Sequence, residues 1–159
     1  MPTTLSASAR KVQEALHAFD VICQVIELPD STRSARDAAQ AIGCEVGQIV
    51  KSLVFKGARS GKPILVLTSG SNRVNEKTLE KFVAEPIKKA DATFVREKTG
   101  FAIGGIPPLG HTEKPETYLD ADLLRYEEIW AAAGTPHAVF KLTPQDLQKI
   151  TDGQIVSVK

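Results

Sequence analysis

Ile49-Val-Lys-Ser-Leu-Val-Phe55 and Pro63-Ile-Leu-Val-Leu-Thr68 are apolar runs on either side of the polar segment Lys56-Gly-Ala-Arg-Ser-Gly-Lys62. Short runs of this kind, rich in β-branched residues and bounded by glycine and charged residues, are typical of buried strands. The segment between them is polar and carries two glycines, which favours a turn. We therefore predict a strand, a turn and a second strand over residues 49–68.

Helix and strand patterns extend outward from this unit in both directions. Apolar residues at helical spacing, together with polar capping residues, predict helices over residues 9–19, 34–41, 75–83, 92–98 and 144–150. Short runs of β-branched and aromatic residues predict strands over residues 21–28, 117–119, 129–133, 138–142 and 154–158. The run 129–133 fits a helix or a strand by propensity, and the turn Gly134-Thr-Pro-His137 after it favours a hairpin.

These patterns predict an α/β fold with one mixed sheet and helices packed around it. Helices and strands intermingle without the strict alternation of a doubly wound parallel sheet. The 159 residues, 42% of them hydrophobic, fit one domain over residues 1–159 with a substantial core. No internal repeat interrupts this pattern.

The composition also indicates in which compartment of the cell the protein works. The first ten residues lack the apolar stretch of a signal peptide, and no run of about 18 apolar residues predicts a membrane span. We therefore expect a soluble, cytoplasmic protein with no membrane partner. Cys23 and Cys44 form neither a CxxC pair nor a disulfide framework, so we interpret both as small hydrophobic residues.

The net charge of +1 is unevenly distributed along the chain. Residues 51–98 contain eleven basic and five acidic residues, a net charge of +6, whereas residues 113–152 contain four basic and eight acidic residues, a net charge of −4. If the middle third of the chain forms one surface, that surface suits phosphate groups. The alternative is a set of solvated helix faces with no partner.

The segment Gly100-Phe-Ala-Ile-Gly-Gly-Ile-Pro-Pro-Leu-Gly110 contains four glycines and two prolines in eleven residues. Glycine permits a close approach of the backbone to a ligand, and proline fixes the backbone and removes a donor. We therefore expect a rigid loop in which Gly104 and Gly105 present main-chain groups to a ligand. Phe101 and Ile103 are expected to anchor this loop in the core.

Common catalytic motifs are missing from the sequence. It has no nucleophile elbow, no phosphate-binding P-loop and no zinc-protease motif, and the glycines do not follow the dinucleotide-binding spacing. Three histidines, His17, His111 and His137, are too scattered to predict a metal site, and we expect neither a metal nor a cofactor. His111 and His137 follow the glycine-rich loop and a turn, where functional residues often lie.

Lys51 is the most informative charged residue, because it lies inside an apolar run. One interpretation is a lysine at a strand end, whose aliphatic stem lies on apolar surface while its ammonium reaches water. The other is a lysine beside the glycine-rich loop that binds a phosphate or carboxylate, or stabilises a developing oxyanion.

Six segments, in order along the chain, resemble the YbaK/ProX family, the freestanding relatives of the editing domain inserted in bacterial prolyl-tRNA synthetases. They are Lys51-Ser-Leu-Val-Phe55, Pro63-Ile-Leu-Val-Leu67, Asn75-Glu-Lys-Thr-Leu79, Ala90-Asp-Ala-Thr-Phe-Val95, Thr99-Gly-Phe-Ala-Ile-Gly-Gly-Ile-Pro-Pro-Leu-Gly-His111 and Val139-Phe-Lys-Leu-Thr-Pro-Gln-Asp-Leu147. The resemblance covers approximately residues 9–158.

The resemblance implies a trans-editing hydrolase, an aminoacyl-tRNA deacylase that hydrolyses the ester between a wrong amino acid and the 3′-terminal adenosine of a tRNA. It implies a catalytic role for Lys51, and it places the family's GxxxP loop on Gly104 to Pro108, with Gly104 and Gly105 supplying backbone contacts. It also implies aminoacyl-tRNA, usually a proline tRNA, as substrate and prolyl-tRNA synthetase as a candidate partner, with no role for DNA. An ester is already activated, so such a site can work by positioning and electrostatic stabilisation without a strong nucleophile.

The amino acid that is removed stays open between alanine, cysteine, serine, threonine and aminobutyrate. Candidate substrate-binding residues besides Pro108 are Thr32, Ser34, Ser69, Gly134 and His137. Some relatives carry a more glycine-rich stretch and a nearby aspartate where this chain has Gly134-Thr-Pro-His137, which speaks against the cysteine-specific branch. The main alternative function is a non-catalytic RNA-binding module that uses the same basic face. A hydrolase of small-molecule esters is disfavoured because no nucleophile is evident.

Overall fold

One mixed sheet of eight strands runs through the structure, a computed structural model that describes residues 5–29 and 34–159. The strand order is β1-β7-β6-β2-β3-β5-β8, and β4 pairs with β2 off this path. The strands are β1 (Val25–Glu27), β2 (Ile49–Gly57), β3 (Pro63–Ser69), β4 (Ile87–Lys89), β5 (Glu116–Asp120), β6 (Ile129–Ala132), β7 (Ala138–Leu142) and β8 (Gln154–Val156).

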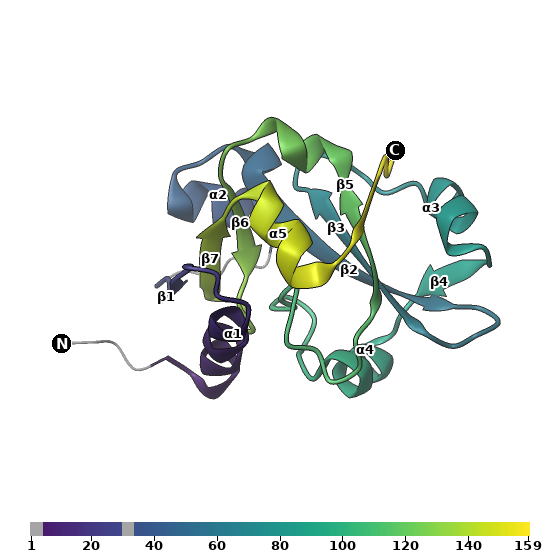
Figure 1. Cartoon of the computed structure of the whole chain (residues 1–159), viewed down its shortest axis with the longest axis horizontal. Coiled ribbons are helices and arrows are strands. Elements are labelled where there is room, and N and C mark those ends of the chain that lie inside the picture. Colours follow the sequence, from purple (N-terminus) through teal and green to yellow (C-terminus); the bar gives the residue numbers. More distant parts are fainter. Residues whose placement is uncertain (1–4, 30–33) are drawn as a thin grey trace.

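The antiparallel hairpin β2–β3 lies at the centre of this sheet (Figure 1). Its register runs from Val50 opposite Ser69 to Lys56 opposite Pro63. All residues of β3 are buried, because helices or loops cover both faces of this strand. The predicted strand, turn and strand are therefore confirmed. The strands β5 and β6 add in parallel on either side, against β3 and β2 respectively.

In the part of the chain that the structure describes, five α-helices accompany the sheet, in the segments that were predicted to be helical. They are α1 (Ala7–Ala18), α2 (Ala35–Ile42), α3 (Glu76–Val83), α4 (Ala92–Thr99) and α5 (Pro144–Thr151), and short 3₁₀ turns cover Val46–Gln48 and Ala121–Arg125. At each helix start a capping side chain accepts a backbone N–H of the first turn, namely Ser6, Ser34, Asn75, Asp91 and Thr143. Such caps satisfy amide groups that a helix leaves unpaired, which is why the helix starts could be predicted well.

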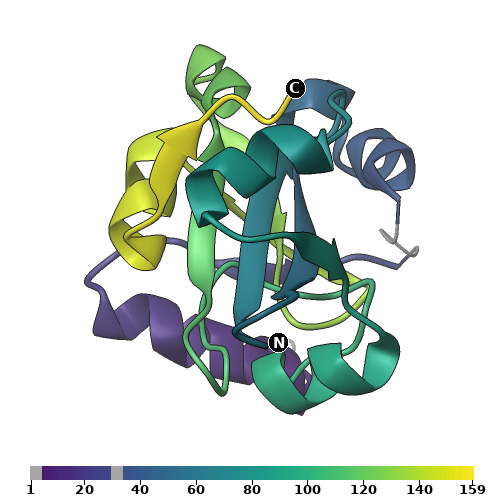
Figure 2. The ribbon, with the colours of Figure 1, turned by 90° about the vertical axis from the view of Figure 1, so that its right-hand side faces the viewer.

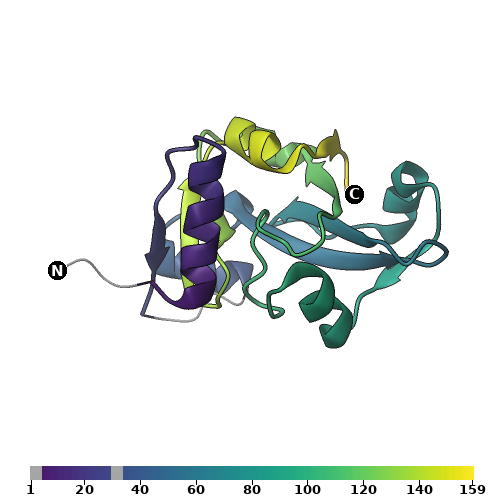
Figure 3. The same cartoon turned by 60° about the horizontal axis from the view of Figure 1, so that its bottom comes forward.

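The helices cover both faces of the sheet. Apolar residues of α1, α4 and α5 pack with Leu65 and Leu67 of β3 in the largest core cluster. Residues of α3 pack on the other face, against Ile64 and Val66, and α2 packs against Ile49 in a third cluster. Figure 2 shows α3 and α4 flanking the hairpin end of the sheet, and Figure 3 shows α1 beside β6 and β7. The predicted α/β architecture with helices around one mixed sheet is confirmed.

Three local predictions differ from the structure. The strand expected over residues 21–28 is shorter, because Ile22 is fully exposed at 103% and the Cys23 amide bonds to the Val21 carbonyl before β1 begins. The strand β4 was missed because its sequence, Ile-Lys-Lys, carries little apolar signal. Phe101 is buried as expected, but Ile103 is 58% exposed and does not anchor the loop in the core. In the described parts of the chain, no helix is long and apolar enough to cross a membrane.

Candidate active site

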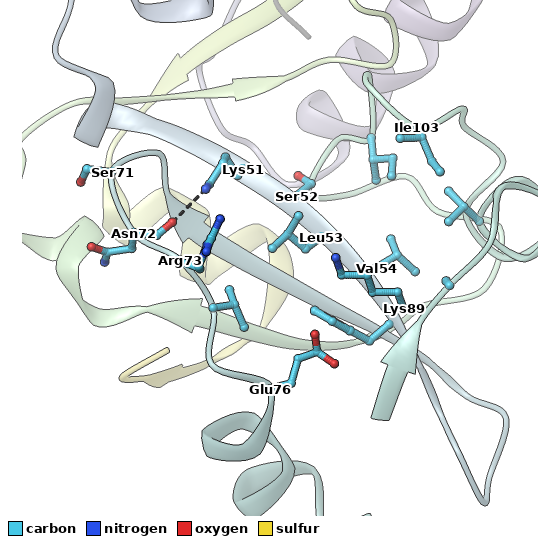
Figure 4. Close-up of a pocket in the computed structure, with 15 residues that line it drawn as sticks. Lys51, Ser52, Leu53, Val54, Ser71, Asn72, Arg73, Glu76, Lys89 and Ile103 are labelled. Carbon is cyan, nitrogen blue, oxygen red and sulfur yellow. Dashed lines mark hydrogen bonds between the residues drawn. The ribbon is translucent and has the colours of Figure 1, made fainter. Parts of the chain in front are cut away.

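Lys51 lies on β2, and its side chain reaches the loop that follows β3. Its ammonium donates a hydrogen bond of 2.8 Å to the main-chain carbonyl of Asn72 (Figure 4). Partial burial is the main cause that lowers the pKa of Lys51 below its ordinary value, and the nearby positive charge of Arg73 lowers the pKa further. The negative charge of Asp120 acts in the opposite direction. Lys51 is therefore a partly desolvated cation beside a second cation, which is a favourable place for an anion.

The loop that holds Lys51 is fixed by two carboxylates. The Asn72 side-chain amide donates to Asp120 Oδ2 and to Asp122 Oδ2, both at 2.8 Å. Asp120 is only 2% exposed and also accepts bonds from the Thr68 hydroxyl and the Ser69 amide. The hydrogen bond from Asn72 is the main cause that lowers the pKa of Asp122. A connected network therefore positions the carbonyl group that receives Lys51.

The glycine-rich loop folds back on itself and on the turn after β6. Gly104 has a φ of 102°, a conformation that glycine adopts readily. The Gly105 amide donates to the Ala102 carbonyl, and the Gly105 carbonyl accepts the Gly134 amide at 2.8 Å. A Cβ at Gly105 would lie 2.7 Å from backbone atoms of Thr135. Both main-chain groups of Gly105 thus hold the loop in place, in contrast to the expectation that they face a ligand.

His111 contacts the glycine-rich loop at Pro107 and Phe101. Its Nε2 lies 2.6 Å from the Pro107 carbonyl, and its ring packs near Phe101 with the ring centroids 6.0 Å apart. Burial lowers the pKa of His111, which favours the neutral ring. His111 and Pro108 line a separate small cavity of about 200 Å³. Pro108 therefore faces away from the Lys51 side of the loop.

Two adjoining cavities meet at Lys51. The larger one, about 820 Å³, includes the polar residues Lys51, Asn72, Arg73, Glu76 and Lys89 in its lining (Figure 4). The smaller one, about 410 Å³, has a mostly apolar lining that includes Ala35, Val50, Gly104 and Ala132. Both are lined by Lys51, Ser52, Leu53, Ile103 and Ile106. The structure thus brings Lys51 and Gly104 to the same cavity.

An interruption in the sheet forms the floor of these cavities. On the side of β2 away from β3, the pairing with β6 ends at Val50 and the pairing with β4 begins at Phe55. Between these points, within residues 5–29 and 34–159, only the Val54 carbonyl receives a backbone bond on this side, from Ala90. We call this interruption, over residues 51–53, the β2 gap. It leaves part of a central strand edge facing the cavities.

The other predicted substrate-binding residues are placed differently. Ser34 lines the smaller cavity and also caps α2. Ser69 is 1% exposed and donates to the Gly47 carbonyl at 2.7 Å, so its hydroxyl is engaged in the core. Gly134 is buried against Ser8, and His137 is exposed, and neither lines the cavities at Lys51. Thr32 lies outside the described residues.

Two lysines lie over the ring of Phe94, and two more come from the neighbouring strand β4. The ammonium groups of Lys56 and Lys98 lie 5.2 and 5.9 Å from the centroid of Phe94, and Lys56 pairs with Lys88 in the β2–β4 ladder. Lys89, the next residue, lines the cavity. We call Lys56, Lys88, Lys89 and Lys98 the β4–α4 patch. Within the described chain only Lys98 of these four forms an ion pair, with Glu113 at 3.1 Å.

Neither cysteine lies in these cavities. Cys23 is buried near β1, Cys44 is partly buried after α2, and both are free thiols. Burial is the main cause that raises the pKa of each thiol. Among residues 5–29 and 34–159, no group of three or more His, Cys, Asp or Glu side chains could hold a metal ion.

Sequence reasoning missed several residues that line the site. Asn72, Arg73 and Glu76 come from the segment after β3, and Lys89 comes from the unpredicted strand β4. The polar run Ser71-Asn-Arg73 directly after a buried strand was a usable signal, since functional residues often follow buried strands. Ser52 and Ile103 carried no comparable signal.

Comparisons with known proteins agree with this geometry. Residues 29–150 match the model of the aminoacyl-tRNA editing domain family, so the chain belongs to that family. A solved structure described provisionally as a trans-editing enzyme for prolyl-tRNA synthetase is 51% identical, with a TM-score of 0.93 over 98% of this chain and 99% of that one. The predicted resemblance is confirmed, and so is the predicted class of activity, aminoacyl-tRNA deacylation.

Two curated relatives extend this picture. The uncharacterised protein YwhH of Bacillus subtilis is 30% identical over 82% of this chain and 83% of its own length. EbsC of Enterococcus faecalis, provisionally named a Cys-tRNA(Pro)/Cys-tRNA(Cys) deacylase, is 30% identical over 79% of this chain and 76% of its own length.

Proposed function

We propose that this protein removes a small wrong amino acid from proline tRNA at the two cavities that meet at Lys51. The observation that carries the proposal is the shared cavity lining of Lys51 and Gly104, which come from segments 53 residues apart. Lys51 and Gly104 act there on the substrate, whereas Gly105 acts by holding the loop. The reaction needs no metal or cofactor, because the substrate is an activated ester.

The larger cavity suits the terminal nucleotide of the tRNA. Lys51, Arg73 and Lys89 line it, and a phosphate there would relieve the repulsion between Lys51 and Arg73. In the β4–α4 patch, Lys56 and Lys88 are paired across β2 and β4, and we propose that the patch meets phosphates of the acceptor stem. A cluster of basic residues on one face is typical of nucleic-acid binding.

The smaller cavity suits the aminoacyl group. Its lining is mostly apolar, and Ser34 adds a hydroxyl group to it, whereas the Ser52 hydroxyl oxygen is buried. In this arrangement a water molecule attacks the ester, and the ribose oxygen leaves. A second site of this kind is useful because one methylene changes binding by only about 1–3 kcal/mol, so that a synthetase accepts some smaller amino acids.

The substrate range follows from the relatives only in part. The name of EbsC points to cysteine, and the solved relative points to prolyl-tRNA synthetase, which we propose as the partner of this chain. Alanine, serine, threonine and aminobutyrate fit the same small apolar cavity. We further propose that residues 1–159 form one deacylase domain that works in the cytoplasm, where tRNA is aminoacylated.

The test is deacylation of a panel of mischarged proline tRNAs by the wild type and by Lys51→Ala. We expect the variant to lose at least about 100-fold in kcat/KM, because a preorganised charge at the reacting group is removed. Lys141→Ala on β7 is the control, since it removes the same charge outside both cavities. Thermal unfolding should show that both variants remain folded. Full activity of Lys51→Ala, or no deacylation of any tRNA by the wild type, would contradict the proposal.

The alternative, an RNA-binding module without activity, makes a different prediction in the same experiment. It requires salt-sensitive tRNA binding with no ester cleavage by the wild type. The lining of one cavity by both Lys51 and Gly104 favours the hydrolase.

A further inference from the structure

The main chain of Ser52 is the accessible part of the β2 gap. Successive residues of an antiparallel strand direct their N–H and C=O groups alternately to opposite neighbours. The Gly57 amide donates to Lys62, and the Ile49 carbonyl accepts from Gly70, so odd-numbered residues of β2 face β3. Ser52 therefore directs its N–H and C=O away from β3. These two groups point into the gap, where the described residues offer them no strand partner.

The burial of Ser52 supports this placement. The residue is partly exposed and lines both cavities, yet its hydroxyl oxygen is buried and without a hydrogen-bond partner among the described residues. The exposed surface of Ser52 must then belong to its main chain and Cβ. A buried strand in mid-sheet normally pairs these groups, and leaving them open is costly unless a ligand or water binds there.

An aminoacyl group has the complementary shape. It carries one N–H donor and one C=O acceptor on adjacent carbons, as a strand residue does, and two such residues pair through two hydrogen bonds. We propose that Ser52 binds the aminoacyl group as a one-residue strand: the ester carbonyl accepts the Ser52 N–H, and the α-ammonium donates to the Ser52 carbonyl. This inference rests on the proposed function and adds the residue that orients the reacting ester.

The opposite wall of the gap fits the same ligand. Ile103 and Ile106 line both cavities, and Ile103 is 58% exposed although it is a large apolar residue. A bound aminoacyl group would cover part of this side chain, and Gly104 between the two isoleucines offers no side chain that would block the ester. The exposure of Ile103, which the core does not explain, is accounted for by a ligand in the gap.

This placement makes the Ser52 N–H an oxyanion donor. When water adds to the ester carbon, a C–O bond forms and the carbonyl electron pair moves to the oxygen that the Ser52 N–H contacts. Collapse of this intermediate breaks the bond to the ribose oxygen, which takes up a proton that the attacking water releases. The products are the free amino acid and the tRNA with its terminal hydroxyl. A donor fixed before the reaction stabilises the charge as it develops.

The first test compares Ser52→Pro with Ser52→Ala. Both variants lack the hydroxyl, but only proline lacks the N–H, and proline is tolerated in strands where the N–H does not take part in the ladder. We expect kcat/KM of the proline variant to be at least about 100-fold below that of the alanine variant, as for the loss of an oxyanion donor. Equal rates for two folded variants, with an active wild type, would overturn the inference and leave the proposed function intact.

The second test does not depend on the folding of a variant. The wild type is labelled with ¹⁵N and titrated with an amide-linked alanyl analogue of the terminal adenosine, which cannot be hydrolysed. We expect the Ser52 amide resonance to shift downfield in proportion to occupancy. If amides around Gly104 respond while Ser52 stays unchanged, the inference fails. If the analogue binds nowhere and the wild type deacylates no mischarged tRNA, the proposed function itself fails.

Discussion

Asn72 shows how one side chain can support a site whose lysine binds the main-chain carbonyl of the same residue. Its carbonyl receives the Lys51 ammonium, while its amide group bridges Asp120 and Asp122. The buried Asp120 carboxylate holds the Asn72 side chain, and this keeps the Asn72 carbonyl in position to bind the Lys51 ammonium. Asn72 is a positioning residue in this sense.

We expect Asn72→Leu to destabilise the fold by about 1–3 kcal/mol, because two carboxylates lose a buried donor. The loop that holds Lys51 would also loosen, so kcat should fall about tenfold or more. The control is Asn75→Ala, which removes the cap of α3 and costs about 1 kcal/mol without touching the site. Urea unfolding and deacylation rates measure both effects. If the two variants lose stability alike and keep the same kcat, Asn72 does not position Lys51.

At this scale the sequence allowed only part of the site to be predicted. Lys51 could be identified because a charged residue is unusual inside an apolar run that predicts a buried strand. Gly104 could be identified because it lies in a glycine-rich segment. Asn72 and Lys89 reach the site only through the pairing of distant segments, which no local pattern encodes. Gly105 was expected to face the ligand, but its main-chain groups bond to Ala102 and Gly134.

At the level of the elements, the turn of the β2–β3 hairpin is stabilised by hydrogen bonds to a residue outside the hairpin. Glu85, which follows α3, accepts bonds from the Arg59 and Ser60 amides and from the Ser60 hydroxyl at the turn. These bonds lower the pKa of Glu85 from 4.5 to about 2, with a smaller contribution from Lys62. The turn of the central hairpin is therefore stabilised by an ionised carboxylate.

This gives a prediction for acid stability. Because the folded-state pKa of Glu85 lies below its unfolded value, its contribution is complete above about pH 4.5 and is lost as the pH falls towards about 2. We expect Glu85→Gln to be less stable than the wild type at pH 7, and the difference should shrink between pH 4.5 and 2. Ser60→Ala, which removes one of three donors, should behave in an intermediate way. Urea unfolding at several pH values measures this, and parallel wild-type and Glu85→Gln profiles would contradict it.

The elements themselves were predictable where local chemistry defines them. Helix starts were found through polar capping residues before apolar residues at helical spacing, and strands through apolar runs. The strand β4 was missed because it is held by pairing with β2 rather than by its own composition. The β2 gap could not be predicted at all, since it depends on where two neighbouring strands end.

For the molecule as a whole, several lysines lie together at one end of the sheet. The β4–α4 patch joins residues from β2, β4 and α4, which lie together at the hairpin end (Figure 2). The sequence indicated a basic middle third, and the fold gathers part of it beside the larger cavity. Lys62, by contrast, is paired with Glu116 and Glu85 and is not free to bind phosphate in the same way.

We expect tRNA binding to weaken as salt rises, because each phosphate contact releases counterions. The double variant Lys56→Ala/Lys88→Ala should reduce the slope of log K against log salt by about 2, close to one unit for each contact. The control Lys141→Ala/Lys149→Ala removes equal charge from β7 and α5. Filter binding over a range of salt concentrations gives the slopes. Indistinguishable slopes for the wild type and the patch variant would show that the patch does not contact tRNA.

The placement of the two cysteines has a consequence for oxidative damage. Peroxides attack exposed thiolates, and the products of further oxidation are irreversible. Here Cys23 and Cys44 lie away from the cavities, and burial raises the pKa of both thiols, so they remain protonated at neutral pH. The groups that we assign to the reaction are an ammonium, main-chain amides and water, none of which peroxide consumes. Proofreading by this protein should therefore continue under oxidising conditions that stop hydrolases with a catalytic cysteine.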